Sequence, residues 1–107
     1  ARACEKYQRI LVIPAGEKWP DHSLRPALED LAAAGGLIAR LHNRKLSAEA
    51  HAARGVYQNL TLAELADCGS ACELRRRGFA ADVALCLQED VSDFACRLQG
   101  EYFTGFR

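Results

Sequence analysis

Residues 25–42 read RPALEDLAAAGGLIARLH, and our fold prediction depends on this stretch. Its leucines and isoleucine recur at helical spacing and predict one apolar face. Together with the leucine just before the stretch, this face consists of Leu24, Leu28, Leu31, Ile38 and Leu41. Pro26 is tolerated only in the first turn of a helix. We therefore expect a helix over 25–42 with Ser23 as its N-cap.

Two adjacent glycines, Gly35 and Gly36, lie inside this predicted helix. Each costs up to ~1 kcal/mol relative to alanine in a helix interior. A closely packed partner would explain why the helix keeps both of them. A break of the helix at the glycine pair is the alternative.

The segment before this helix, QRILVIP at 8–14, predicts a strand. Ile10 to Ile13 form a continuous aliphatic run, which is typical of a strand that is buried on both faces. Pro14 would end the strand, and Ala15-Gly16 would supply the turn. Such a strand needs neighbouring strands on both sides.

The rest of the chain predicts several helices and a final hairpin. Ser47 is the expected cap of a helix over 48–66, and the run from Ser70 to Glu73 fits a capping box. A further helix is expected over 80–89, with Val83, Leu87 and Cys86 as its inward candidates, and a hairpin over 94–106 with its turn at 99–100. The fold class is therefore α/β, with few strands and several helices in a single domain over 1–107.

The composition excludes some classes of function. The 107 residues carry 14 Lys plus Arg and 14 Asp plus Glu, so the net charge is zero. This balance argues against a nucleic-acid partner and against a polybasic membrane anchor. No apolar run reaches the roughly 18 residues of a membrane span. The five cysteines show no framework spacing, which favours reduced thiols and a cytoplasmic location.

Ionisable residues crowd the turn between the predicted strand and helix, at a strand end where α/β proteins often bind ligands. Lys18, Ser23 and Arg25 are the candidates for binding a phosphate group. Carboxylates supply the hard oxygen ligands that Mg²⁺ prefers, and the candidate metal ligands are Glu17, Asp21, Glu29 and Asp30. The alternative is that Asp21 and Ser23 only cap the helix while Glu29 and Asp30 face water.

Other motifs support no specific chemistry. Cys68, Cys72, His42 and His51 do not form a set of zinc ligands at workable spacing. The chain has no P-loop, no dinucleotide fingerprint and no nucleophile elbow. No residue is therefore assigned as the catalytic nucleophile.

Several separated blocks resemble the C-terminal half of the 2-phosphosulpholactate phosphatase family. They are PAGEKWPDHSLRPALEDLAAAGGLIARL at 14–41, LSAEAHAA at 46–53, the stretch from Gly69 to Leu74, and RGFAADVALCLQEDVSD at 77–93. The resemblance implies part of a three-layer α/β/α sandwich. It places metal or substrate roles on the turn from Glu17 to Arg25 and on Glu29-Asp30. Asp82 and Asp90 match acidic positions of the family's later block.

The resemblance also implies an activity. Family members hydrolyse 2-phosphosulpholactate to sulpholactate and phosphate with Mg²⁺. The family's N-terminal signature motifs are not in this sequence, so we expect a truncated protein that is complete only with the absent half.

Our leading hypothesis is an Mg²⁺-dependent phosphatase that takes a small phosphorylated or sulfonated anion. The alternative is a non-catalytic, dimeric anion-binding or protein-interaction domain, and a zinc module comes third.

Overall fold

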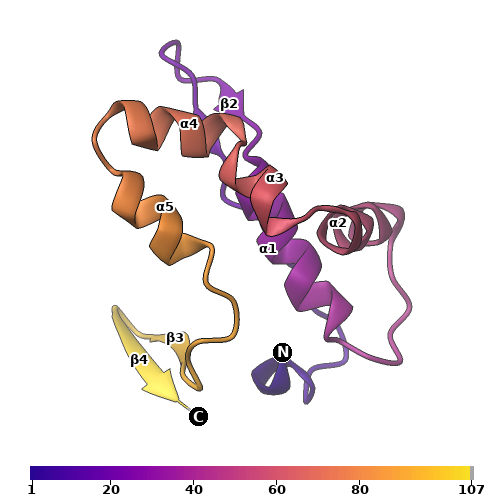
Figure 1. The fold of residues 1–107 in the computed structure, drawn as a ribbon. Helices are drawn as coiled ribbons and strands as arrows, with labels where there is room; N and C mark the ends of the chain where they lie inside the picture. The colour runs from indigo at the N-terminus through magenta and orange to yellow at the C-terminus, as the bar shows by residue number, and fades with distance from the viewer. Residues whose placement is uncertain (107) are drawn as a thin grey trace.

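The helix α1 (Leu28–Ala39) carries most of the buried residues of the chain. The computed structural model describes residues 1–106 and places the other elements around this helix (Figure 1). The other helices are η1 (Arg2–Cys4), α2 (Ala48–Asn59), α3 (Leu62–Ala66), α4 (Gly69–Arg76) and α5 (Ala80–Cys86). The strands are β1 (Glu17–Lys18), β2 (Leu24–Arg25), β3 (Ala95–Gln99) and β4 (Tyr102–Phe106). The mixed α/β class, with few strands and several helices, is confirmed, whereas the layers of a sandwich stay a prediction.

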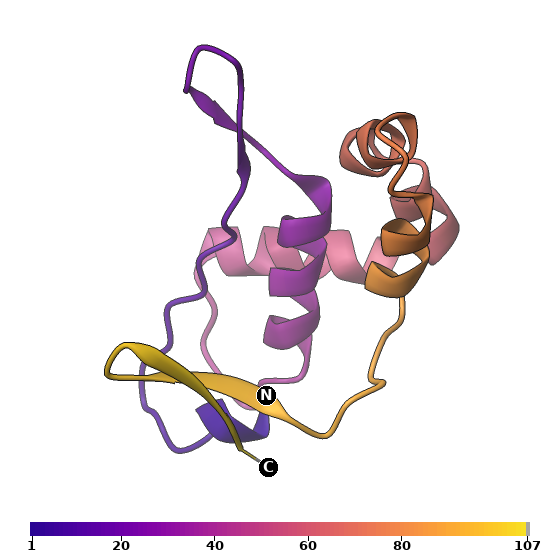
Figure 2. The ribbon, with the colours of Figure 1, turned by 90° about the vertical axis from the view of Figure 1, so that its left-hand side faces the viewer.

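The glycine pair of α1 lies against α2, which crosses α1 (Figure 2). A Cβ atom at Gly35 would overlap the carbonyl oxygen of Ala53, and it would lie 2.7 Å from the carbonyl carbon of that residue. A Cβ at Gly36 would lie 3.1 Å from two ring carbons of Tyr57. The expected close packing partner is therefore confirmed, and the helix runs unbroken through both glycines.

The predicted bounds of 25–42 for this helix are wrong at both ends. Arg25 pairs with Glu17 in the β1–β2 hairpin, so its backbone is extended, and α1 begins only after Ala27. Ser23 is therefore not the N-cap. At the other end, Arg40 is the C-cap, and the chain turns away through Asn43, which has a left-handed φ of 58°.

The predicted helix over 48–66 is two helices. Ser47 caps the first as expected, because its side chain accepts from the Ala50 N–H at 3.2 Å. Thr61 and Glu64 form a capping box that starts α3. The predicted helix is therefore interrupted at Leu60, which is the C-cap of α2. The capping box predicted at 70–73 is wrong, since α4 begins after Cys68 without a side-chain cap.

The last helix and the hairpin are close to the prediction. α5 ends at Cys86 rather than at residue 89, with Val83 buried and Cys86 exposed. β3 and β4 pair antiparallel, and Gln99 faces Tyr102, so the turn is Gly100-Glu101, one residue later than predicted. Gly100 has a φ of 63°, which suits the first central position of a two-residue hairpin turn.

The strand predicted over 8–14 is wrong. In the described part of the chain these residues pair with no strand, and the four strands form two separate hairpins. Leu11 and Ile13 are 83% and 76% exposed, so the segment is not buried on both faces. A continuous apolar run predicts such burial only where strands flank it. Here the segment passes alongside α1 (Figure 2), and Arg44 fixes its start by donating to the carbonyls of Tyr7 and Gln8.

The contact between α1 and α2 gives a paired prediction. Gly35→Ala forces a methyl group into the backbone of Ala53 and should lower the free energy of unfolding by about 1–3 kcal/mol, the usual cost of overpacking. Gly55→Ala is the matched control, because a Cβ at Gly55 of α2 meets no described atom within 4 Å. It should stabilise the chain by up to about 1 kcal/mol. Urea unfolding of both variants tests this, and equal effects would contradict the close contact.

Candidate functional site

The predicted site residues lie on the β1–β2 hairpin and on the first turn of α1. The hairpin projects beyond the N-terminal end of α1 (Figure 2). Glu17 pairs with Arg25 and Lys18 with Leu24, while the Trp19 N–H donates to the Ser23 carbonyl at 2.9 Å. The backbone therefore fixes this turn through its own hydrogen bonds.

Asp21 and Ser23 organise the tip of the hairpin. The Ser23 hydroxyl and backbone N–H donate to the same Asp21 oxygen, at 2.6 and 2.9 Å. These hydrogen bonds, with the hydroxyl bond the larger cause, lower the pKa of Asp21 below its ordinary 3.8. His22 between them has a left-handed φ of 66°. The expectation that Asp21 and Ser23 cap a helix is wrong, because they close a turn instead.

Asp30 ties the hairpin to α1. Its Oδ2 accepts from the Gly16 N–H at 2.7 Å, across 14 residues of sequence. Gly16 has a φ of 70°, which a residue with a Cβ rarely adopts. This bond brings the carboxylate of Asp30 next to the backbone of Glu17. In residues 1–106, no further polar contact is recorded for Asp30 or for the side chain of Glu17.

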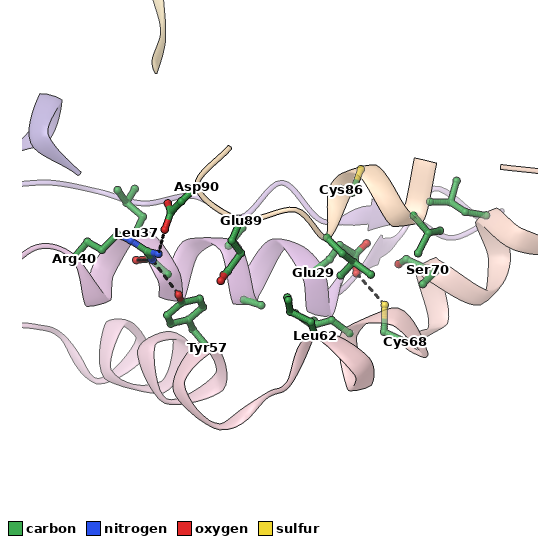
Figure 3. A pocket seen from close by; sticks show the side chains of 18 of the residues that line it. Glu29, Leu37, Arg40, Tyr57, Leu62, Cys68, Ser70, Cys86, Glu89 and Asp90 are labelled. Atoms are coloured by element: carbon green, nitrogen blue, oxygen red, sulfur yellow. Dashed lines mark hydrogen bonds and ion pairs between the residues drawn. The ribbon is translucent and has the colours of Figure 1, made fainter. Parts of the chain in front are cut away.

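Glu29, the residue before Asp30, faces a different region. Its Oε2 accepts from the Cys68 thiol at 3.8 Å, so it faces α4 rather than the hairpin (Figure 3). Neighbouring residues on a helix point about 100° apart, which explains the separation of Glu29 from Asp30. Over residues 1–106, no group of three or more His, Cys, Asp or Glu is placed to hold a metal ion.

The two basic residues of the turn differ. Arg25 forms an ion pair with Glu73 of α4 at 3.0 Å and lies over the Trp19 ring at 5.5 Å. Its charge is therefore already compensated. Lys18 is exposed, and no ionic partner is recorded for it in the part of the chain that the structure describes.

A pocket of about 420 Å³, which the sequence did not predict, lies between α1 and the helices α3 to α5 (Figure 3). At one end Arg40 donates to the Tyr57 hydroxyl at 3.1 Å and to Asp90 at 2.8 Å. Glu29 and Cys68 lie near the other end (Figure 3). Asp82, the other acidic position of the family's later block, is exposed in the first turn of α5.

A sequence signal for this pocket is weak because its polar end is assembled from distant residues. Arg40 and Asp90 are 50 residues apart, and Arg40 and Tyr57 are 17 apart. The glycine pair predicted only that α1 has a close packing partner. The structure shows that this partner is α2, which brings Tyr57 to Arg40.

Comparison with known proteins identifies a family. A family model described as 2-phosphosulpholactate phosphatase matches residues 1–101, nearly the whole chain. No curated protein and no solved structure gives a significant match. Among the described residues, no helix is long and apolar enough to cross a membrane.

The turn gives a pH-dependent prediction. The pKa of Asp21 is lower in the folded chain than in the unfolded chain, so the contact with Ser23 stabilises the turn above pH 3.8. This contribution is lost as the pH falls through the folded-state pKa. Ser23→Ala should raise the pKa of Asp21 toward 3.8, as followed by NMR titration of its side-chain carbonyl. Ser47→Ala is the control and should leave the pKa of Asp21 unchanged. If Ser23→Ala also left it unchanged, the hydrogen bonds from Ser23 would not be the cause of the low pKa.

Proposed function

The chain belongs to the 2-phosphosulpholactate phosphatase family, and from this premise we propose that it takes part in Mg²⁺-dependent hydrolysis of a phosphate monoester. The substrate class is a small phosphorylated or sulfonated anion, and the setting is the cytoplasm. The family match over residues 1–101 is the observation that carries the proposal. No nucleic acid and no membrane takes part.

The N-terminal end of α1 has features that suit an anion. The Ala27 N-cap makes no side-chain capping bond, so the first N–H groups of α1 keep their donor capacity. The partial positive charge at a helix start favours phosphate groups. Lys18 on the adjoining hairpin adds a full positive charge without a recorded acidic partner among residues 1–106. We therefore assign phosphate binding first to Lys18, with Arg25 and Ser23 beside it.

Asp30 and Glu17 fit a magnesium ion better than the other two candidates do. Mg²⁺ usually keeps several waters and takes only one or two protein carboxylates, so a cage of three acidic residues is not required. Asp30 has one oxygen on Gly16 and a second that is open to a further ligand. Asp21 and Glu29, also candidate ligands, have contacts with Ser23 and Cys68. When bound, the metal would stabilise negative charge on the transferring phosphoryl group.

The protein's own contribution is orientation and charge. The Gly16–Asp30 bond fixes the hairpin on the start of α1, so Lys18 and the helix N–H groups are held as one unit. Preorganised donors of this kind act on the charge that develops on phosphate oxygens during transfer.

A second candidate function is a non-catalytic anion-binding or interaction domain that is dimeric. Large apolar side chains on the surface favour it, namely Leu11, Ile13, Tyr102 and Phe103, each three-quarters exposed or more. An isolated two-stranded hairpin such as β3–β4 is marginally stable in water, so a partner surface would stabilise it.

For the phosphatase, we expect Asp30→Asn to weaken Mg²⁺-dependent phosphate binding by about tenfold or more, equivalent to ~1.4 kcal/mol. The amide oxygen can still accept from the Gly16 N–H, so the hairpin stays attached while the charge is lost. NMR titration of the amides of residues 15–30 with phosphate and Mg²⁺ measures this. The same substitution in a complete homologue should lower the release of phosphate from 2-phosphosulpholactate in parallel.

Asp67→Asn is the control, because Asp67 is an exposed carboxylate that pairs with Arg75 and is not among the candidate metal ligands. Unchanged Mg²⁺-dependent binding in Asp30→Asn would remove Asp30 from the metal role. A wild-type chain that does not bind phosphate in the presence of Mg²⁺ would contradict the phosphatase proposal.

For the interaction domain, sedimentation velocity should show a dimer, and replacing Leu11 and Ile13 by serine should shift it toward monomer. Asp67→Asn, which replaces an exposed carboxylate that pairs with Arg75, is the control. A wild-type monomer throughout the concentration range would contradict this candidate without affecting the first one.

A further inference from the structure

The pocket between α1 and helices α3 to α5 has the size and lining of a small-molecule site. Its volume of about 420 Å³ lies in the usual range of roughly 300–1,000 Å³. Most of its wall is apolar, including Leu37, Leu62, Leu74, Val83 and Leu87. A ligand there would have an apolar body.

The polar end of the pocket is built around one cation. The Nη1 of Arg40 donates to the Gly36 carbonyl at 3.0 Å and to the Tyr57 hydroxyl at 3.1 Å. The guanidinium also lies over the Tyr57 ring, 5.4 Å from its centroid. These contacts come from the tightly packed α1–α2 pair, so the guanidinium is fixed before any ligand arrives.

The present partner of this cation is a carboxylate that can leave. Asp90 Oδ2 lies 2.8 Å from Arg40 Nη2, but the Asp90 side chain is 77% exposed. Asp90 follows α5 in a loop and has a left-handed φ of 52°. Exposed ion pairs are held weakly because water competes for both charges. A carboxylate from a ligand could therefore replace Asp90 on the same nitrogen.

We propose that this pocket binds a small amphipathic monocarboxylate. Its carboxylate takes the place of Asp90 on Arg40, and its apolar body lies between α1 and α5. Guanidinium groups suit carboxylates because their planar N–H donors match two oxygens. Glu29 and Glu89 also line the pocket, so a doubly charged phosphate is repelled more strongly than a monoanion. The proposal is independent of the phosphatase proposal, which concerns the hairpin.

The first test is NMR titration of the 107-residue chain with 4-phenylbutanoate. Saturable shifts should map to α1, Tyr57 and α5, with a Kd of about a millimolar, as expected for a ligand with a dozen non-hydrogen atoms. The matched probes 4-phenylbutanol and 4-phenylbutylamine should bind at least about tenfold more weakly, because neither pairs with a guanidinium. Equal binding of the alcohol, or tighter binding of the amine, would overturn the proposal.

Two substitutions should act in opposite directions. Arg40→Gln should weaken 4-phenylbutanoate binding by about tenfold, since a charged hydrogen bond is lost. Asp90→Asn removes the competing charge and should tighten binding about two- to fivefold, which is the range for an exposed ion pair. Asp90 lies in an exposed loop, and the Asp90→Asn substitution leaves the Arg40–Tyr57 contact in place. The Asp90→Asn variant therefore remains informative if Arg40→Gln unfolds.

The matched control is the ion pair of Arg75 and Asp67, which is exposed to a similar degree and lies outside the pocket lining. Asp67→Asn should leave the affinity for 4-phenylbutanoate unchanged. Unchanged or weaker binding in Asp90→Asn would show that Asp90 does not occupy the ligand's place, and would overturn the proposal.

Discussion

The close contact between Gly35 of α1 and Ala53 of α2 is the constraint on which the rest of the structure depends. A side chain at residue 35 would overlap the carbonyl group of Ala53, so the two helix backbones approach as closely as they can. The buried core is made largely of alanine around this crossing, with few bulky side chains. Close packing of the two backbones, rather than large buried side chains, is therefore the main feature of this core.

This crossing also positions both functional regions. One end of α1 places Asp30 against Gly16 and so holds the β1–β2 hairpin. The other end places Arg40 over Tyr57, which belongs to the facing helix. The two adjacent acidic residues of the first turn face different neighbours, since Glu29 reaches Cys68 in the pocket. One rigid helix thus connects the proposed phosphate site with the proposed carboxylate site.

Local signals in the sequence predict those features that a few neighbouring residues decide. The Gly35–Gly36 pair predicted a close partner, Ser47 predicted a helix start, and the turn at residue 100 predicted the last hairpin. Helix ends were harder because local signals compete. The bonds of Thr61 with Glu64 start a new helix where the apolar pattern alone predicted continuation.

Features set by distant residues could not be predicted. The run from Ile10 to Ile13 indicates burial between strands, but burial depends on what flanks the run, and no strand in the described residues does so. Likewise, Arg40 and Asp90 meet across 50 residues. The predicted site residues lie on the β1–β2 hairpin and on the first turn of α1, but only the structure shows that the adjacent carboxylates of Glu29 and Asp30 face different neighbours.

The pairing of cations within the chain determines where an anion can bind. Arg25 and Arg40 each already hold a carboxylate, from Glu73 and Asp90. An incoming anion must compete with these residues, whereas Lys18 has no such partner among the described residues. A strongly charged phosphate therefore suits the exposed hairpin, where Lys18 and the helix start add to its binding. A weakly held carboxylate such as Asp90 can be replaced only by a ligand that also gains apolar contacts, and the pocket beside Arg40 supplies them.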